Sequence, residues 1–157
     1  MTTQCWVCSK ILKRGRLCVK HKRSYIYRKE FDFVSFKGRR KISQGQQLLY
    51  ISARKIFRKR CYQEVVFDWN HCRRFDIVVP ALKVILEADG RQHDSFVPFF
   101  HKTFRAFKTA QATDKIKEDM AMANGWAVIR FNHKQLEDIQ GVEARIRQIK
   151  RKYSTVA

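Results

Sequence analysis

The sequence is poor in acidic residues, with 14 Asp or Glu among 157 residues against 34 Lys or Arg. It also lacks a continuous apolar run of membrane-spanning length. The first residues, Met1 to Trp6, lack the apolar run preceded by positive charge that is typical of a secretory signal. We therefore expect no membrane partner and a cytoplasmic location. The cysteines are five, an odd number that fits a disulfide framework poorly and suits a reducing compartment.

The excess of basic residues gives a net charge of +20. A field of this size attracts polyanions, and nucleic acid is the commonest such partner. A solubility device and a cationic membrane-surface protein are the alternatives, but no single amphipathic helix concentrates the charge. The hydrophobic content of 45%, which includes 12 Phe, indicates a folded core rather than a disordered basic tail. At this length we expect one α/β domain with a small appendage.

Two close pairs near the N-terminus, Cys5-x-x-Cys8 and Cys18-x-x-His21, supply three thiolates and one imidazole. This spacing is typical of a tetrahedral zinc ion, and four protein ligands leave no open position for chemistry, so we expect a structural site. Unligated thiols are the alternative, and they are the default interpretation for Cys61 and Cys72. The cations expected to meet phosphates lie between the two pairs and in the stretch beyond them: Lys10, Lys13, Arg14, Arg16, Arg39 and Arg40.

Along the chain we expect a zinc-binding knuckle over residues 1–24, a basic linker over 25–42 and an α/β domain over 43–157. Hydrophobic periodicity and β-branched runs predict the order helix, three strands, helix, strand, helix. The expected ranges are Ser43 to Lys59, Cys61 to Trp69, Arg73 to Val79, Leu82 to Asp89, Phe104 to Asn124, Trp126 to Phe131 and Gln135 to Lys152. Ser43 should be the N-cap of the first helix, and Gln46 could complete a capping box. The second and third strands should form an antiparallel hairpin around Pro80-Ala81.

Three of the few carboxylates, Asp76, Glu87 and Asp89, lie within or at the end of apolar β-runs, where an unpaired charge is costly. In the expected hairpin Asp76 stands opposite Glu87, so the three could converge on Mg²⁺ or Mn²⁺. His93, just beyond, could act as a general base. Simpler interpretations stay open: an ion pair for Asp76, a turn for Asp89, a helix cap for Asp94 and a surface histidine for His93.

The carboxylates belong to a longer pattern along the chain. It consists of Arg74-Phe-Asp-Ile-Val-Val-Pro, Val84-Ile-Leu-Glu-Ala-Asp-Gly-Arg-Gln-His-Asp, Asp114-x-x-Lys117 and Gly125-Trp-Ala-Val-Ile-Arg-Phe. Together they resemble the PD-(D/E)xK nuclease superfamily, and within it the branch of very-short-patch repair endonucleases and EDxHD phage homing endonucleases. The resemblance covers roughly residues 43–149. It implies a restriction-endonuclease-like core and a bacterial setting, with a phage or mobile-element origin.

The resemblance implies that Asp76 and Glu87 hold the catalytic metal. Asp89 stands where the superfamily usually has a lysine, so His93 could take over part of that task. Lys115 or Lys117 could also supply the missing cation, with solvated helix cations as the alternative. Gln46 falls where many relatives carry a glutamate, and Glu64 is a possible substitute acid.

The function expected from this resemblance is metal-dependent hydrolysis of DNA phosphodiesters. The alternative is a zinc-containing nucleic-acid-binding or regulatory protein on a nuclease-like fold that has lost activity. RNA as substrate, and a monomer or a homodimer, stay open.

Overall fold

The computed structural model describes residues 2–37, 42–70, 73–91, 101 and 103–154. Its strands are β1 Thr3–Gln4, β2 Ile11–Leu12, β3 Tyr25–Arg28, β4 Phe33–Phe36, β5 Tyr62–Phe67, β6 Phe75–Val79, β7 Val84–Ala88 and β8 Ala127–Phe131. Its α-helices are α1 Val19–Lys22, α2 Gln44–Phe57, α5 Phe104–Ala123, α6 His133–Leu136 and α7 Ile139–Ser154. Short 3-10 turns, Asp68–Asn70 and Pro80–Leu82, follow β5 and β6.

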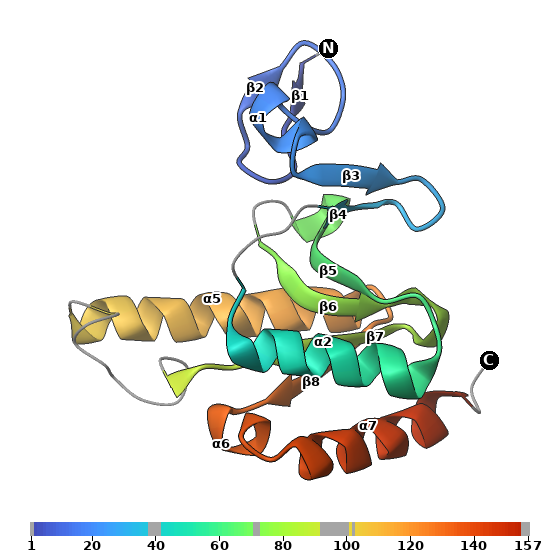
Figure 1. The fold of residues 1–157 in the computed structure, drawn as a ribbon. Coiled ribbons are helices and arrows are strands. Elements are labelled where there is room, and N and C mark those ends of the chain that lie inside the picture. The colour runs from blue at the N-terminus through green and yellow to red at the C-terminus, as the bar shows by residue number, and fades with distance from the viewer. Residues whose placement is uncertain (1, 38–41, 71–72, 92–100, 102, 155–157) are drawn as a thin grey trace.

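A six-stranded sheet in the order β3-β4-β5-β6-β7-β8 forms the body of the molecule (Figure 1). Each neighbouring pair is antiparallel except β7 and β8, which are parallel and are joined through α5. The mixed α/β class and the β6–β7 hairpin are therefore confirmed. The segment between β7 and β8 is long enough for this parallel pairing, since parallel neighbours need a connection of a dozen or more residues.

The stretch expected to be a linker is instead the outer hairpin of this sheet, formed by β3 and β4. Tyr25, Phe33 and Val34 are buried, and β4 pairs with β5. The basic residues of this stretch mask a short β-pattern, in which Tyr25 and Phe33 are buried while Lys29 is exposed.

Helices cover both faces of the sheet. α2 and α7 pack on one face, where the core includes Leu49, Ile77, Leu86 and Ile146. α5 packs on the other face through Ala121, beside a cluster rich in Phe and Trp. None of the helices in the described part of the chain is both long and apolar enough to span a bilayer.

The helix boundaries follow local signals. Ser43 caps α2, since its hydroxyl accepts from the Gln46 N–H, and α5 ends before Gly125, whose φ is +79°. The prediction of a single closing helix over Gln135 to Lys152 was wrong. The structure divides it into α6, which starts in a capping box with Asn132 as N-cap, and α7, which begins after Asp138.

The N-terminal finger, residues 2–24, is not separate from the sheet. Its residues Cys5, Trp6 and Leu17 share one hydrophobic cluster with Val34 of β4 and Val66 of β5. Figure 1 shows the finger seated on the β3 end of the sheet. The position of the finger relative to the body is therefore held by packing rather than by a flexible connector.

Candidate functional site

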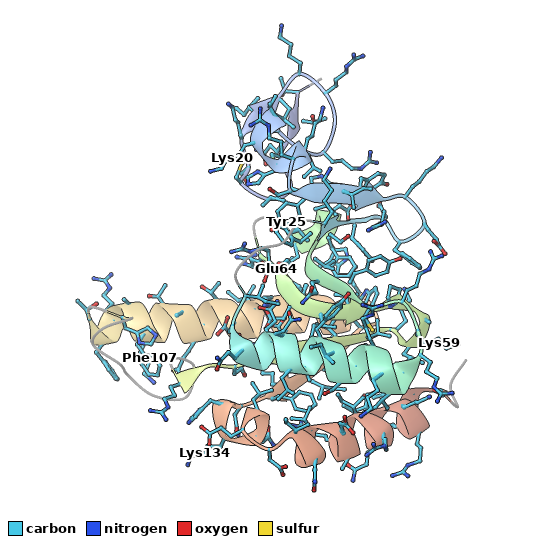
Figure 2. The ribbon with its side chains drawn as sticks, in the orientation of Figure 1. Lys20, Tyr25, Lys59, Glu64, Phe107 and Lys134 are labelled. Atoms are coloured by element: carbon cyan, nitrogen blue, oxygen red, sulfur yellow. The ribbon has the colours of Figure 1, made fainter. Side chains whose placement is uncertain are left out.

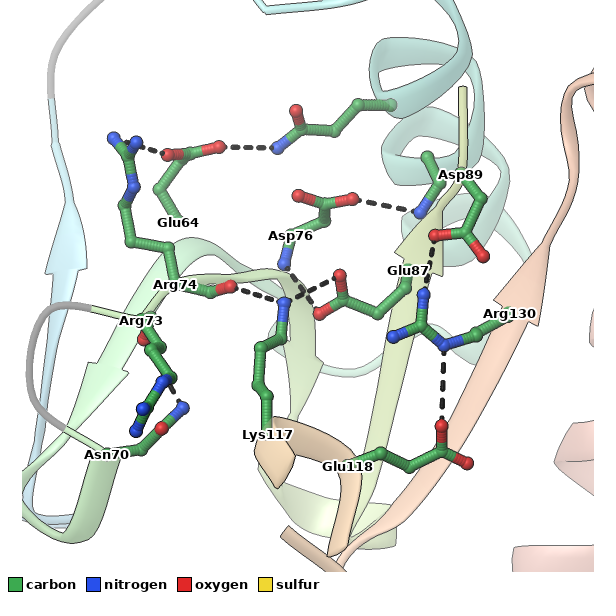
Figure 3. Close-up of polar contacts among 12 residues, drawn as sticks. Glu64, Asn70, Arg73, Arg74, Asp76, Glu87, Asp89, Lys117, Glu118 and Arg130 are labelled. Atoms are coloured by element: carbon green, nitrogen blue, oxygen red, sulfur yellow. Dashed lines mark hydrogen bonds and ion pairs between the residues drawn. The ribbon is translucent and has the colours of Figure 1, made fainter. Parts of the chain in front are cut away.

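Three neighbouring strands place acidic side chains in one row across the sheet. The registers of β5 with β6 and of β6 with β7 put Asp76 between Glu64 on one side and Glu87 on the other. The hairpin thus brings Asp76 opposite Glu87, as its sequence predicts. Figure 3 shows this row together with the cations around it.

Asp76, which is half-buried, and Glu87, which is buried, form a carboxylate pair. Asp76 Oδ2 accepts from the Ala88 N–H at 2.9 Å, and the Asp76 N–H donates to Glu87 Oε1 at 3.4 Å. Burial, together with the charge of Asp76, raises the pKa of Glu87 to about 8, although Lys117 works against the shift. Burial also raises the pKa of Asp76, against the hydrogen bond from Ala88. Two carboxylates that resist losing their protons are typical of a site that favours a cation.

Lys117 brings a positive charge to this pair from α5. Its Nζ donates to Glu87 Oε2 at 2.9 Å and to the Arg74 carbonyl at 2.7 Å. Lys117 is only 9% exposed. Lys115, the other candidate, is a surface residue whose Nζ lies 3.4 Å from Asp119 Oδ1. The solvated-cation interpretation therefore holds for Lys115 and is wrong for Lys117.

Asp89 does not converge with the other two carboxylates as expected. Its Oδ1 accepts from Arg130 of β8 at 2.7 Å, and Arg130 also lies 3.4 Å from Glu118 of α5. Burial works against the charge of Arg130, but Asp89 outweighs it and raises the pKa of the guanidinium. Asp89 therefore has a cationic partner within the chain.

Arg130 is the residue of this site that sequence reasoning missed. A signal was present, since a cation inside the strand Ala127–Phe131 is costly unless it is paired. The same argument that singled out the carboxylates in β-runs applies to an arginine in one.

Gln46 and Arg74 hold Glu64 from both sides. Gln46 Nε2 donates to Glu64 Oε1 at 3.0 Å, and Arg74 NH1 lies 3.1 Å from Glu64 Oε2. The Gln46 side chain thus faces the acidic row instead of completing a capping box. Glu64 has a φ of +50°, a left-handed conformation that is uncommon outside glycine, so the strand is distorted where it presents this acid.

His93 and Asp94 lie outside the described residues, as do Arg39, Arg40 and Cys72. The proposed roles of these residues stay predictions from the sequence.

The four finger residues Cys5, Cys8, Cys18 and His21 converge, with their ligand atoms all within 4.8 Å of one another. His21 Nδ1 lies 3.2 Å from Cys18 Sγ and 3.4 Å from Cys5 Sγ, and the sulfurs of Cys8 and Cys18 are 4.0 Å apart. A tetrahedron with zinc–sulfur bonds of about 2.3 Å has edges of about 3.8 Å, so the donors fit that ion. The cluster is consistent with a structural zinc site.

The thiol of Cys5 ionises more readily than an ordinary cysteine thiol. Burial opposes its ionisation, but hydrogen bonds from backbone N–H groups and from His21 outweigh burial and lower its pKa to about 6. Thiolates are the form that binds zinc. Within the described residues, the finger cluster is the one set of three or more Cys, His, Asp or Glu residues close enough to share an ion. Asp76 and Glu87 remain a pair.

The four predicted phosphate contacts of the finger, Lys10, Lys13, Arg14 and Arg16, are exposed. The Arg16 guanidinium lies 4.0 Å from the centre of the Tyr27 ring and 5.3 Å from that of Trp6. Lys10, Lys13 and Arg14 follow the turn after Cys8 and face solvent.

No family model matches the sequence, and no solved structure matches it. Over 60 residues the chain is 39% identical to a protein of Invertebrate iridescent virus 6 described as uncharacterized protein 307L. The shared region covers 38% of this chain and 30% of the viral protein. The similarity therefore spans less than a third of that protein and assigns no family.

Proposed function

We propose that the chain is a divalent-metal-dependent DNA endonuclease of the PD-(D/E)xK type, in which Asp76 and Glu87 hold the metal. The observation that carries this proposal is the Asp76–Glu87 pair with the buried Lys117 ammonium 2.9 Å from Glu87 Oε2. Two acids on adjacent strands and a lysine beside them are the groups that the resemblance implies.

Carboxylate oxygens are the ligands that Mg²⁺ and Mn²⁺ prefer, and such an ion activates water and stabilises charge on a phosphodiester. The raised pKa of both acids fits this donor set, because a divalent cation would stabilise the ionised form of each. Asp76 and Glu87 would hold the ion, and Lys117 would offset the negative charge that develops on the phosphate.

Lys117 could supply the cation that the superfamily pattern places after the second acid and that this chain lacks there. The usual lysine, two residues after the second acid, is replaced by Asp89, which Arg130 neutralises. The helix lysine supplies the cation from another element. Many relatives carry a glutamate on the first helix, at the place of Gln46. Glu64, which accepts a hydrogen bond from Gln46, is the candidate substitute for that acid. His93 stays the proposed general base.

The finger would hold a structural zinc ion and present its exposed cations to phosphates. Such contacts give affinity and orientation without sequence choice. The described residues hold one such carboxylate pair, which suggests one nick per protomer, so double-strand cutting would need a dimer or two successive events. The cytoplasmic, bacterial or phage setting stays part of this proposal.

The proposal is tested by incubating supercoiled plasmid with zinc-loaded protein and Mg²⁺ or Mn²⁺. Wild type should nick the plasmid, whereas Asp76→Asn and Glu87→Gln, which keep size and remove charge, should not. Lys115→Gln is the matched control and should cut like wild type.

Two other outcomes have definite meanings. If wild type binds DNA but cuts it with neither metal, the endonuclease proposal is wrong, and the alternative of an inactive, zinc-containing nucleic-acid-binding protein is favoured. Cleavage of structured RNA but not of DNA would move the activity to RNA.

A further inference from the structure

The cations of this chain are segregated along the sequence. Three stretches that contain no Asp or Glu, residues 1–29, 33–63 and 144–157, hold 23 of the 34 Lys and Arg residues. The first stretch contains the finger. The other two are far apart in sequence, yet the fold brings their ends together.

The meeting point is the C-terminal end of α2 and α7. Lys150 Nζ of α7 donates to the carbonyl of Ile56, near the last residue of α2, at 2.7 Å. Three consecutive exposed cations, Arg58, Lys59 and Arg60, follow α2 directly. Arg151 and Lys152, also exposed, follow Lys150 on α7. We call these five exposed cations the helix-end patch.

Compensation of the helix dipoles does not account for the three cations after α2. Helix C-termini favour cations in their last turn, and Arg54 and Lys55 already occupy that turn of α2. Arg58, Lys59 and Arg60 lie beyond the helix and make no ion pair with any residue that the structure describes. Adjacent like charges repel one another, so this segment gains most from an anion outside the chain.

The nearby acid is already engaged. Glu143 Oε1 lies 2.7 Å from Lys55 Nζ, and Glu143 Oε2 lies 2.9 Å from Arg147 NH2. Among the described residues, Arg58, Lys59 and Arg60 therefore present positive charge that Glu143 does not compensate.

The patch is also separate from the candidate active site. Gln46, near the start of α2, contacts Glu64, and the eleven residues from Gln46 to Phe57 correspond to about 16 Å of helix. This exceeds the screening length of about 8 Å at physiological salt. Figure 2 shows Lys59 at the end of α2 away from Glu64, and Lys20 on the finger, away from Lys59.

We propose that the helix-end patch is a second surface for the phosphate backbone of duplex DNA, distinct from the finger. Its cations lie on two neighbouring elements, and Arg and Lys side chains bind phosphates without reading bases. The inference rests on the nucleic-acid partner of the proposed function, but not on cleavage.

The test is the salt dependence of binding to a fluorescently labelled DNA duplex, with zinc-loaded protein and no Mg²⁺ or Mn²⁺. The patch variant combines Arg58→Asn, Lys59→Gln and Arg60→Gln, with Asn chosen because Arg58 has a left-handed backbone. The matched control, Lys55→Gln with Arg147→Gln and Lys115→Gln, loses the same charge from cations that carboxylates already pair. A finger variant neutralises Lys10, Lys13 and Arg14.

Each contacted phosphate contributes about 0.9 to the slope of log affinity against log salt, so the patch variant should flatten the slope by about 2 to 3. The control should change it by less than about 1, with all variants melting like wild type. If the patch variant behaves like the control while the finger variant weakens binding, the proposal of a second DNA-binding surface is wrong, but DNA remains the proposed partner. If wild type binds no DNA, the proposed partner fails and this inference fails with it.

Discussion

Lys115 and Lys117 lie two residues apart on α5, yet one faces solvent and the other contacts Glu87. Two residues turn a helix by about 200°, so neighbouring lysines of this kind point in opposite directions. The buried positions Phe107 and Ala121 mark the inner stripe of α5, and Lys117 lies four residues before Ala121 on that stripe. Helical periodicity could therefore have chosen Lys117. The pairing with Glu87 could not be predicted, because it depends on how α5 packs against the sheet.

Replacing Lys117 with Met should reduce plasmid nicking by about 100-fold or more, because the site loses the cation that offsets charge on the phosphate. The rate is measured in single turnovers with saturating Mn²⁺, so that weaker metal binding does not hide the effect. Lys115→Met is the control and should retain the wild-type rate. Equal rates for both variants would remove Lys117 from the chemistry.

The carboxylate pair predicts a pH dependence of metal binding. Burial and Asp76 raise the pKa of Glu87 to about 8, so below that pH a proton competes with the metal. The apparent affinity for Mn²⁺ should rise from pH 6.5 to about pH 8 and then level off. Titration calorimetry at several pH values measures this, and a flat affinity across the range would contradict it.

The same shift has a consequence for stability without the metal. Between the ordinary value of 4.5 and about 8, the folded protein keeps a proton on Glu87 that the unfolded chain has released. The contribution of Glu87 to stability therefore falls as pH rises through this window.

At the scale of elements, the β3–β4 hairpin joins the finger to the sheet. Tyr25 of β3 packs its ring edge-on against the ring of His21, with the ring centres 5.9 Å apart. Burial opposes the charge of Arg74, but its neighbours Tyr25 and Glu64 outweigh burial and raise the pKa of that guanidinium. Tyr25 thus lies between His21 of the finger cluster and Arg74, which contacts Glu64. Order in the finger should support order in the acidic row.

Loss of the proposed finger metal should therefore also destabilise the sheet. Cys18→Ser should lose about one equivalent of zinc and lower the melting temperature, because the ion contributes to folding and the finger shares its core with β4 and β5. Zinc content is measured by elemental analysis beside thermal melting. Cys61→Ser, which changes a cysteine outside the cluster, should keep both values. A folded finger that carries no zinc in wild type would rule out the metal site.

Arg130 joins three elements, since it pairs Asp89 after β7 and Glu118 of α5 from its place in β8. Arg130→Met should cost about 2 to 3 kcal/mol in urea unfolding, because it leaves the carboxylate of Asp89 buried without its partner. Arg147→Met breaks an exposed pair with Glu143 and should cost less than about 1 kcal/mol. Equal costs would show that the Arg130 pair is no more than a surface contact.

At the scale of the whole molecule, periodic signals were sufficient for much of the fold. The strands β5 to β7, predicted from runs rich in Val, Ile and Phe, the Ser43 cap and Gly125 all lie where the sequence predicts. The β3–β4 hairpin was missed because basic residues mask its short pattern. The break between α6 and α7 was missed because continuous periodicity does not reveal a local cap.

The candidate site could be predicted in part for a related reason. A carboxylate in an apolar strand is costly, which singles out Asp76 and Glu87 from the sequence alone. Arg130 and the Arg74–Glu64–Gln46 contacts depend on strand order and on the placement of α2. Those come from packing between distant segments, which local patterns do not encode.

The central claim is that Asp76 and Glu87 share a divalent cation beside Lys117. Crystals of the zinc-loaded protein soaked in Mn²⁺, with data collected at the manganese absorption edge, test it most directly. The account predicts an anomalous peak within coordination distance of both carboxylates, and no such peak in Asp76→Asn. Zinc at the finger, seen in data collected at the zinc edge, with no manganese peak between Asp76 and Glu87 would contradict it.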